Sequence, residues 1–300
     1  MGQVAAILIA GPTASGKSAL ALRLAREHGG AVVNADSMQV YRDLRILTAR
    51  PTPDEMGDVP HRLYGHVDGA VNYSVGRYVE DATRTFAELA AEGRVPVVVG
   101  GTGLYFKALL DGLSDMPAVP DAIRARVRGS AEGRATAELH ADLAALDPDG
   151  AARLRPSDRQ RLLRALEVFA ATGRSITSFQ GPRRPGPLAG HDVIRLRVAP
   201  DRAELRARID QRFEAMIATG ALGELAALGD RQLDPALPVM RAHGVPALLA
   251  HLRGDIGLAE AVARGQADTR AYAKRQLTWA RGQMADWRAI PAPDAFIAEL

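Results

Sequence analysis

The sequence predicts an α/β protein in which a parallel sheet is flanked by helices and interrupted by an inserted all-helical subdomain. Short apolar runs alternate with amphipathic helical segments in the first third of the chain, a pattern typical of a parallel sheet covered on both faces. One strand–helix junction carries Gly-x-x-x-x-Gly-Lys-Ser at residues 11–18, which makes the predicted sheet one of the P-loop type. The middle of the chain is rich in Ala, Arg and Leu, which favours helices.

Hydrophobic periodicity gives the elements of the first third in order. The predicted strands are Ile7–Ala10, Ala31–Asn34 and Val95–Val99, and the predicted helices are Ala19–His28 and Tyr78–Glu92. In parallel sheets, ligands gather at the carboxyl ends of the strands. Residues 11–18, 36–39 and 100–105 follow three of these strands, so we expect them to converge on one cleft.

The character of the chain changes near residue 115. We expect residues 1–115 and 191–300 to form a P-loop-like core, and residues 116–190 to form the inserted subdomain. Residues 180–190 are rich in Pro and Gly and predict a loop. Asp201 is placed to cap a helix, with Glu204 at capping-box spacing. Further predicted elements are helices at 121–129, 136–146, 160–171 and 269–287 and a strand at 193–198.

Composition excludes several classes of protein. Of the 300 residues, 47% are hydrophobic and 24% are charged, as in a soluble globular protein. The chain has no cysteine, which excludes disulfides and thiolate metal sites. The sequence contains no run of about 18 apolar residues, so it predicts no membrane span. Residues 1–3 carry no basic cluster of a signal peptide. We expect a cytoplasmic monomer with no membrane partner.

The positive charge of the chain is almost entirely arginine, because the only lysines are Lys17, Lys107 and Lys274. The guanidinium group suits phosphate and stacks on bases, so this composition is compatible with a nucleic-acid partner. A GC-rich genome would produce the same bias through its codons. Composition alone leaves both interpretations open.

The segment 11–18 is the strongest motif of the sequence. Its backbone N–H groups and the following helix N-terminus suit a diphosphate or a longer polyphosphate. Lys17 adds a full charge, and the hydroxyl of Ser18 is a candidate ligand for Mg²⁺. The predicted phosphate-binding residues are Gly11, Pro12, Thr13, Ala14, Ser15, Gly16, Lys17 and Ser18. The flanking periodicity argues against a chance match on an ordinary turn.

Asp36 follows the second predicted strand and is expected beside the phosphate loop. In P-loop nucleotidases, a carboxylate at a strand end holds Mg²⁺ through water. The approach to Asp36 is less apolar than the strand that usually precedes that acid, and Val95–Val99 ends without an acid. The loop could therefore hold a leaving group while Asp36 accepts a proton. Spacing alone leaves a general base and a metal helper open.

Several blocks in order resemble the tRNA dimethylallyltransferases, also called tRNA isopentenyltransferases. The most specific are Asn-Ala-Asp-Ser-Met-Gln-Val-Tyr-Arg at 34–42 and Tyr-Ala-Lys-Arg-Gln-Leu-Thr-Trp at 272–279. The others are residues 11–18, 59–61, 100–105, 160–168 and 172–175. Together they span nearly the whole chain.

The resemblance implies transfer of a dimethylallyl group from its diphosphate to the exocyclic amine of the adenosine on the 3′ side of the anticodon. Asp36 takes the role of general base by resemblance, because the adenine amine is a poor nucleophile that must lose a proton. Thr13 and Thr102 are placed beside the donor and the adenosine. Arg212 is our candidate for an extra cation on the diphosphate, although a solvated helix arginine is the plain alternative.

The resemblance also implies a surface for the tRNA anticodon stem-loop, with the adenosine turned out of its stack. Arginines on the helix predicted at 160–171 and basic residues of the C-terminal helix would contact phosphates. The predicted tRNA-binding residues are Asp36, Ser37, Met38, Gln39, Thr102, Arg124, Gln160, Arg161, Leu162, Leu163, Arg164, Lys274, Arg275, Gln276 and Arg281.

One block departs from the family pattern. Where the family reads roughly Arg-x-Ile-Gly-Tyr-(Lys/Arg), this chain has Arg-Ala-His-Gly-Val-Pro at 241–246. Arg241 and Gly244 are kept, whereas the aromatic residue and the following basic residue are absent. This puts tRNA contacts from 241–246 in doubt but leaves the chemistry intact.

Two other classes compete with this interpretation. A P-loop small-molecule kinase would share the fold but transfer a phosphoryl group from ATP, and it leaves the basic C-terminal helix unexplained. A GTPase-like RNA-binding module would need a guanine-reading (Asn/Thr)-Lys-x-Asp block, which the positions of the lysines exclude.

Overall fold

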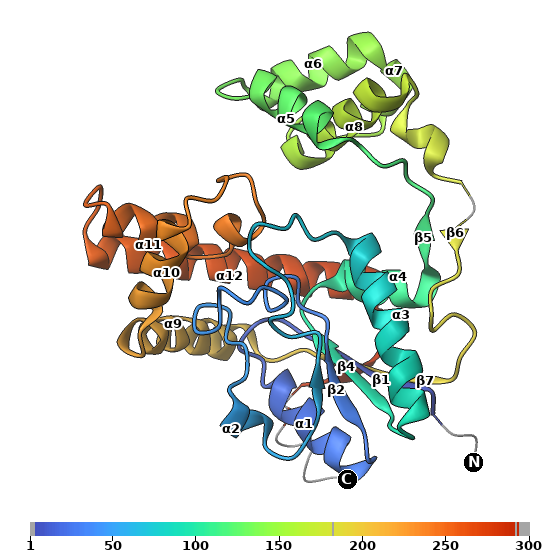
Figure 1. The fold of residues 1–300 in the computed structure, drawn as a ribbon, viewed down its shortest axis with the longest axis vertical. Coiled ribbons are helices and arrows are strands. Elements are labelled where there is room, and N and C mark those ends of the chain that lie inside the picture. Colours follow the sequence, from blue (N-terminus) through green and yellow to red (C-terminus); the bar gives the residue numbers. More distant parts are fainter. Residues whose placement is uncertain (1–3, 182, 292, 294–300) are drawn as a thin grey trace. The chain divides into compact units, whose positions relative to one another are not determined.

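The computed structural model describes residues 4–181, 183–291 and 293. It divides into two compact units (Figure 1). We call residues 1–110 with 186–300 the sheet unit and residues 111–185 the helical unit. Each boundary lies five residues before the one expected from the sequence. Residues 1–3, on which the expectation about a signal peptide rested, lie outside the described residues.

The sheet unit contains a six-stranded sheet in the order β3-β2-β4-β1-β7-β8. All of its strand pairs are parallel, which confirms the predicted sheet. The strands are β1 (Ala6–Ala10), β2 (Ala31–Asn34), β3 (His61–Arg62), β4 (Pro96–Gly100), β7 (Val193–Val198) and β8 (Arg288–Ile290). β1 lies between β4 and β7, so both edges of this strand are paired, and every residue in it is buried.

The two faces of the sheet are covered by different helices (Figure 1). Ile7 and Ile9 pack on one face with the buried stripe of helix α1 (Lys17–Glu27). Leu8 packs on the other face with helices α3 (Val75–Ala91) and α4 (Gly103–Asp111). This division follows from the alternation of side chains along a strand.

A second core in the sheet unit lies away from the sheet. It is formed by the segment after β2 together with the helices that follow β7. These helices are α9 (Arg202–Ala218), α10 (Ala221–Asp230), α11 (Val245–Leu252) and α12 (Leu258–Gln283). Short helices at α2 (Pro53–Met56) and η2 (Val239–Arg241) complete the unit. Sequence periodicity did not predict α2, α4, α10 or α11.

The predicted start of the C-terminal helix was wrong. α12 begins at Leu258, eleven residues before the expected start at Thr269, and it ends at Gln283. The helix continues through Gly265, although glycine disfavours the interior of a helix. A Cβ atom at Gly265 would lie 2.1 Å from the ring of Phe213 on α9, so this glycine allows the two helices to approach closely.

The predicted cap of α9 was correct only in part. The Asp201 carboxylate accepts hydrogen bonds from the backbone of Ala203 at 2.8 Å and of Glu204 at 3.1 Å. The Glu204 carboxylate instead accepts a hydrogen bond from Arg208 at 2.7 Å. The reciprocal half of the capping box is therefore absent from this helix N-terminus.

The helical unit contains α5 (Asp121–Ser130), α6 (Thr136–Leu146), α7 (Pro148–Ala152), α8 (Arg159–Thr172) and η1 (Ile176–Phe179). Leu143, Ala151, Leu162 and Ala165 form its buried core. A two-stranded antiparallel sheet of β5 (Leu113–Ser114) and β6 (Arg183–Arg184) joins the segments that enter and leave the unit. The predicted loop at 180–190 therefore contains a short strand, while residue 182 lies outside the described residues.

No helix in the described part of the chain is both long enough and apolar enough to cross a membrane.

We expect Gly100→Ala to destabilise the sheet unit. A Cβ atom at Gly100 would lie 2.0 Å from the backbone oxygen of Ala35 at the end of β2. Relieving that overlap requires the backbone to move, so the free energy of unfolding should fall by about 2–3 kcal/mol. Urea denaturation measures the change.

Gly223→Ala is the matched control, because no atom lies within 4 Å of its Cβ position on α10. It should raise the free energy of unfolding by about 0.5–1 kcal/mol through helix propensity. Equal stability of the two variants would contradict the expected close approach of β2 and β4.

Candidate active site

The phosphate loop joins β1 to α1, as the sequence predicted. It turns through two residues with positive φ, Ala14 at 60° and Gly16 at 83°. The Gly11 N–H donates a hydrogen bond to Gly100 O at 3.2 Å, which ties the start of the loop to the end of β4. No side chain of the described residues caps the N-terminus of α1, so its first N–H groups remain available to an anion.

Lys17 is the first residue of α1 and is partly buried. Its Nζ donates a hydrogen bond to Pro12 O at 3.1 Å, within the phosphate loop. The pKa of Lys17 is lowered to about 8, mainly by burial; the carboxylate of Asp36 opposes the shift, and the positive charge of Arg212 adds to it. Lys17 on α1 therefore lies within electrostatic reach of charged side chains from the end of β2 and from α9.

The two serines of the phosphate loop have different surroundings. Ser15 is buried, and its hydroxyl has no partner among the described residues. Ser18 is exposed in the first turn of α1. Mg²⁺ usually takes one or two protein oxygens and fills its remaining positions with water and phosphate. The hydroxyl of Ser18 fits that limited role, and no cluster of three acidic or histidine ligands occurs in the described ranges.

The turn that carries Asp36 is held by the buried side chain of Asn34. The Oδ1 atom of Asn34 accepts a hydrogen bond from the Asp36 N–H at 2.9 Å. Its Nδ2 atom donates to Asp36 O at 3.0 Å and to Leu63 O at 3.1 Å. The Asp36 Oδ1 atom accepts from the Met38 N–H at 2.9 Å. Its Oδ2 atom has no donor in the described part of the chain and remains able to accept a proton.

Thr102 connects the end of β4 to the Asp36 turn. Its Oγ1 accepts a hydrogen bond from the Ser37 N–H at 2.9 Å and donates one to the Ser37 hydroxyl at 3.2 Å. The Thr102 N–H donates to Ala35 O at 3.2 Å. The structure thus brings together the polar ends of β1, β2 and β4, which the sequence predicted from parallel topology alone.

A pocket opens where the phosphate loop, the Asp36 turn and the helices α9 and α12 meet. Its polar side contains Thr13, Asp36 and Arg212, and Arg212 itself is exposed. The apolar part of the lining comes mostly from α9 and from the segment after β2. The apolar lining residues are Ala14, Met38, Leu47, Ile209, Phe213, Met216 and Ala242.

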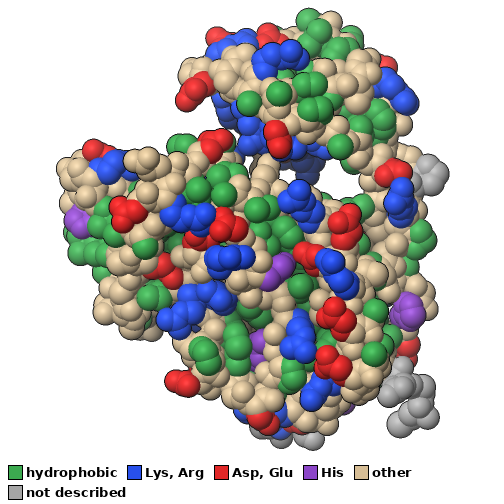
Figure 2. Space-filling model, in the orientation of Figure 1, with side chains coloured by type: hydrophobic (Ala, Val, Ile, Leu, Met, Phe, Trp, Pro, Cys, Tyr) green, Lys and Arg blue, Asp and Glu red, His purple; other side chains and the backbone are tan. Residues whose placement is uncertain are grey.

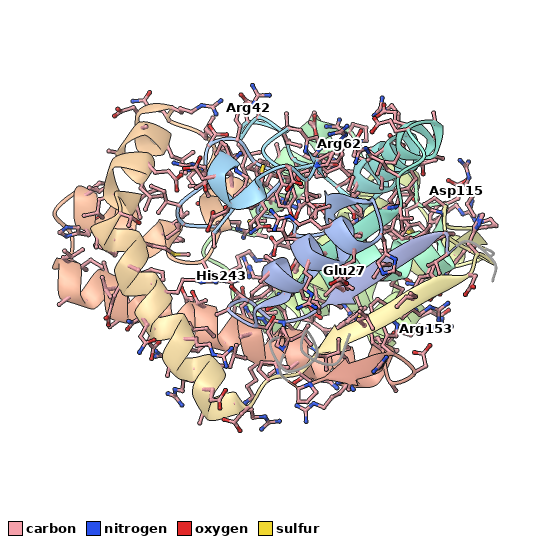
Figure 3. All side chains as sticks on the ribbon, turned by 90° about the horizontal axis from the view of Figure 1, so that it is seen from below. Glu27, Arg42, Arg62, Asp115, Arg153 and His243 are labelled. Carbon is pink, nitrogen blue, oxygen red and sulfur yellow. The ribbon has the colours of Figure 1, made fainter. Side chains whose placement is uncertain are left out.

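Two aromatic side chains complete the pocket wall. The rings of His243 and Tyr272 lie with their centroids 4.4 Å apart. His243 is labelled in Figure 3. Burial and the charge of Arg275 lower the pKa of His243, which favours the neutral imidazole, while Asp268 and Asp36 oppose the shift. Burial raises the pKa of Tyr272, so its phenol stays protonated. This wall therefore carries no positive charge of its own near neutral pH.

Some predicted tRNA-binding residues make internal contacts. The Gln39 Nε2 donates hydrogen bonds to Thr48 O and Ala49 O, both at 2.9 Å. Gln276 bonds within the sheet unit through both ends of its amide. On α12, Lys274, Arg275 and Arg281 are exposed, and the Arg275 guanidinium lies 5.6 Å from the centre of the Tyr272 ring.

The remaining predicted tRNA-binding residues lie in the helical unit. Gln160 and Arg161 are exposed, and Leu163 is half-buried. The Leu162 side chain is fully buried in the core, so it supports α8 and does not reach the surface. Arg124 pairs with Asp121 at 2.6 Å, and Arg164 lies 3.7 Å from the buried carboxylate of Glu167. Figure 2 shows Lys and Arg side chains gathered along one edge of this unit.

Comparison with known proteins assigns this chain to a family. A family model described as IPP transferase matches residues 39–283. A tRNA dimethylallyltransferase of Methylobacterium radiotolerans is 67% identical over 297 residues, which cover 99% of this chain and 96% of that protein. The chain belongs to the IPP transferase family. The resemblance inferred from the sequence is confirmed, and the chain is a transferase enzyme.

Solved structures of the family share the fold. A tRNA isopentenylpyrophosphate transferase of Bacillus halodurans is 31% identical with a TM-score of 0.69, covering 96% of this chain and 90% of that one. A eukaryotic dimethylallyltransferase described as acting on tRNA is 28% identical with a TM-score of 0.75, covering 93% of this chain and 70% of that one.

Sequence reasoning missed several residues of this candidate site. Asn34 and Tyr272 lie inside the two most specific blocks, yet only the fold reveals that one holds the Asp36 turn and the other lines the pocket. Phe213 directly follows Arg212, and the sequence predicted it only as a core residue of a helix. His243 occupies the divergent block 241–246, so the departure from the family pattern was the available signal.

We expect Asn34→Leu to destabilise the Asp36 turn. The change leaves the Asp36 N–H and the carbonyl groups of Asp36 and Leu63 without partners. Unpaired buried groups should lower the free energy of unfolding by about 2–4 kcal/mol, as measured by urea denaturation.

Asn72→Leu provides the control at an exposed asparagine. Its effect should stay within about 0.5 kcal/mol. A small effect at Asn34 as well would show that the turn is held by other contacts.

Proposed function

We propose that the chain transfers a dimethylallyl group from dimethylallyl diphosphate to the exocyclic N6 amine of the tRNA adenosine on the 3′ side of the anticodon, and releases diphosphate. Membership of the IPP transferase family and the names of its relatives support this reaction. One observation carries the proposal: the phosphate loop, the carboxylate of Asp36 and an apolar wall line the same pocket.

The polar side of the pocket suits the diphosphate of the donor. The open N-terminus of α1, Lys17 and Arg212 would stabilise the negative charge that grows on the leaving group. A magnesium ion, with Ser18 as its protein ligand, would supply further charge neutralisation when it is bound. The apolar lining, which includes Met38, Phe213 and Met216, suits the five-carbon group because burial of apolar surface is favourable.

The reaction at Asp36 follows from the proton balance. The N6 lone pair forms a bond to C1 of the dimethylallyl group as the bond from C1 to the diphosphate oxygen breaks. The nitrogen then has one proton too many, and the Asp36 Oδ2 atom is the acceptor that the turn leaves unpaired. The bridging oxygen departs with the electron pair as part of diphosphate.

The acceptor adenosine must leave its stack to reach Asp36. The Ser37 and Thr102 hydroxyls lie beside Asp36 and are suited to hydrogen bonds with the turned-out base, whereas Gln39 offers only its Oε1 atom. Exposed Arg161, Lys274, Arg275 and Arg281 are suited to phosphate contacts with the anticodon stem-loop. The cytoplasmic location and the monomeric state stay predictions.

The decisive experiment is mass analysis of tRNA nucleosides after incubation with dimethylallyl diphosphate and Mg²⁺. The proposal requires N6-dimethylallyl adenosine to form at one position of an unmodified tRNA. Turnover of ATP on a small molecule, with no labelling of tRNA, would favour the P-loop kinase instead.

We expect Asp36→Asn to lower kcat by at least about 10²-fold with little change in tRNA affinity. Asparagine keeps an oxygen that can accept the Met38 N–H but cannot take up a proton at neutral pH. Single-turnover kinetics and tRNA binding measured together separate the two effects.

Asp54→Asn is the control at an exposed carboxylate in the first turn of α2. It should leave kcat unchanged. If Asp36→Asn alters only the dependence of the rate on Mg²⁺, Asp36 is a metal helper and the proposed base is wrong.

We expect donor affinity to fall between pH 7 and pH 9. A lysine with a pKa of about 8 is mostly charged at the lower pH and mostly neutral at the higher one. If the charged form binds diphosphate, affinity should drop about tenfold over this range, and binding above pH 8 should take up a proton. Calorimetry in buffers of different ionisation enthalpy measures both quantities.

Lys17→Arg keeps its charge at both pH values, so its affinity should be nearly independent of pH even if it is weaker. A wild-type affinity that is constant from pH 7 to pH 9 would rule out this role for Lys17.

A further inference from the structure

Gln276 occupies an unusual place between two loops of the active site. It lies on α12 and is half-buried. Its Oε1 accepts a hydrogen bond from the Thr13 N–H in the phosphate loop at 3.1 Å. Its Nε2 donates a hydrogen bond to Gly101 O, just after β4, at 2.9 Å. A single side-chain amide thus joins loops that follow different strands.

The two partners require an amide at this position. Thr13 presents a donor and Gly101 presents an acceptor, so the side chain must accept at one atom and donate at the other. A carboxylate could accept from Thr13 but would face Gly101 O with a second acceptor. An aliphatic side chain of similar length would leave both backbone groups unpaired.

Two glycines make room for this contact. A Cβ atom at Gly101 would lie 2.0 Å from the Gln276 Nε2, and a Cβ atom at Gly103 would lie 2.2 Å from the ring of Trp279. Gln276 and Trp279 are three residues apart and share one face of α12. The blocks 100–105 and 272–279 are therefore complementary surfaces that pack against each other.

The contact extends to the Asp36 turn through Tyr272. Tyr272 lines the same pocket as Asp36, and the side chains of Thr102 and Gln276 lie close enough to the Tyr272 phenol to oppose the rise in its pKa. Thr102 in turn bonds to Ser37, the neighbour of Asp36. α12 thus contacts the phosphate loop through Gln276 and contributes Tyr272 to the pocket that Asp36 lines.

We propose that Gln276 is a positioning residue that holds Thr13 and the phosphate loop in the conformation that binds the donor diphosphate. This assignment rests on the proposed function and replaces the tRNA contact that the sequence predicted for Gln276. The amide is occupied on both sides by backbone groups of the sheet unit, whereas its neighbours Lys274 and Arg275 are exposed.

The test compares Gln276→Met with Gln283→Met. The first change removes both hydrogen bonds with a side chain of similar length, and the second alters an exposed glutamine at the end of the same helix. We expect Gln276→Met to raise KM for dimethylallyl diphosphate about tenfold, equivalent to about 1.4 kcal/mol, with kcat and the tRNA Kd changed less than threefold. Gln283→Met should match the wild type.

Two further variants keep the test independent of folding. The Cβ atom added by Gly101→Ala would displace the Gln276 amide, so this variant should also raise KM for the donor. Gln276→Glu should raise it more than Gln276→Met, because it faces Gly101 O with an oxygen and adds a negative charge near the diphosphate site. A loss of folded protein alone would lower the apparent kcat without changing KM for the donor.

Binding of inorganic pyrophosphate with Mg²⁺, measured by calorimetry, separates this inference from the proposed function. Weaker pyrophosphate binding by Gln276→Met supports the positioning role even if the wild type does not modify tRNA. An unchanged pyrophosphate Kd and an unchanged KM for the donor overturn it. If Gln276→Met raises the tRNA Kd while donor binding stays normal, Gln276 contacts tRNA as the sequence predicted, and the positioning role is overturned.

Discussion

The candidate active site depends on the parallel alignment of β1, β2 and β4, because hydrogen bonds join the carboxyl end of β4 to those of β1 and β2. The Gly11 N–H bonds to Gly100 O, and the Ala35 N–H bonds to Val99 O at 2.7 Å. The Thr102 N–H bonds to Ala35 O, so the chain leaving β4 is attached to the end of β2. Because Gly100 has no Cβ, the strands approach closely enough for the loops to share one pocket.

The pocket lining has a polar half and an apolar half. The polar half includes Thr13 and Asp36, which follow β1 and β2, together with Arg212 of α9. The apolar half comes from α9 and the second core, which also packs the segment after β2. A ligand with an anionic end and an apolar end matches this division, and a purely polar phosphorylated ligand would leave the wall of Phe213 and Met216 unused.

Arginine has two uses in this chain. In the helical unit, Arg128 donates to the buried carboxylate of Glu167 at 2.8 Å, and Arg159 donates to Arg134 O at 2.8 Å. These guanidinium groups connect α5 and the segment before α6 with α8, so they hold the fold together. On the visible face of the sheet unit, positive and negative side chains alternate (Figure 2). The guanidinium groups that make these internal bonds are therefore not available to a polyanionic partner.

The sequence by itself determined the phosphate loop, the parallel sheet and the family, because these depend on local spacing and on the period of apolar residues. It also placed Asp36 and Thr102 correctly at strand ends, since parallel topology brings such ends together. Only the tertiary structure decided that Leu162 is buried, that α12 continues through Gly265, and that Gln276 faces the phosphate loop. Which face of a helix is buried depends on residues distant in the chain, here Phe213, Thr13 and Gly101. Such contacts cannot be predicted from the local sequence of the helix.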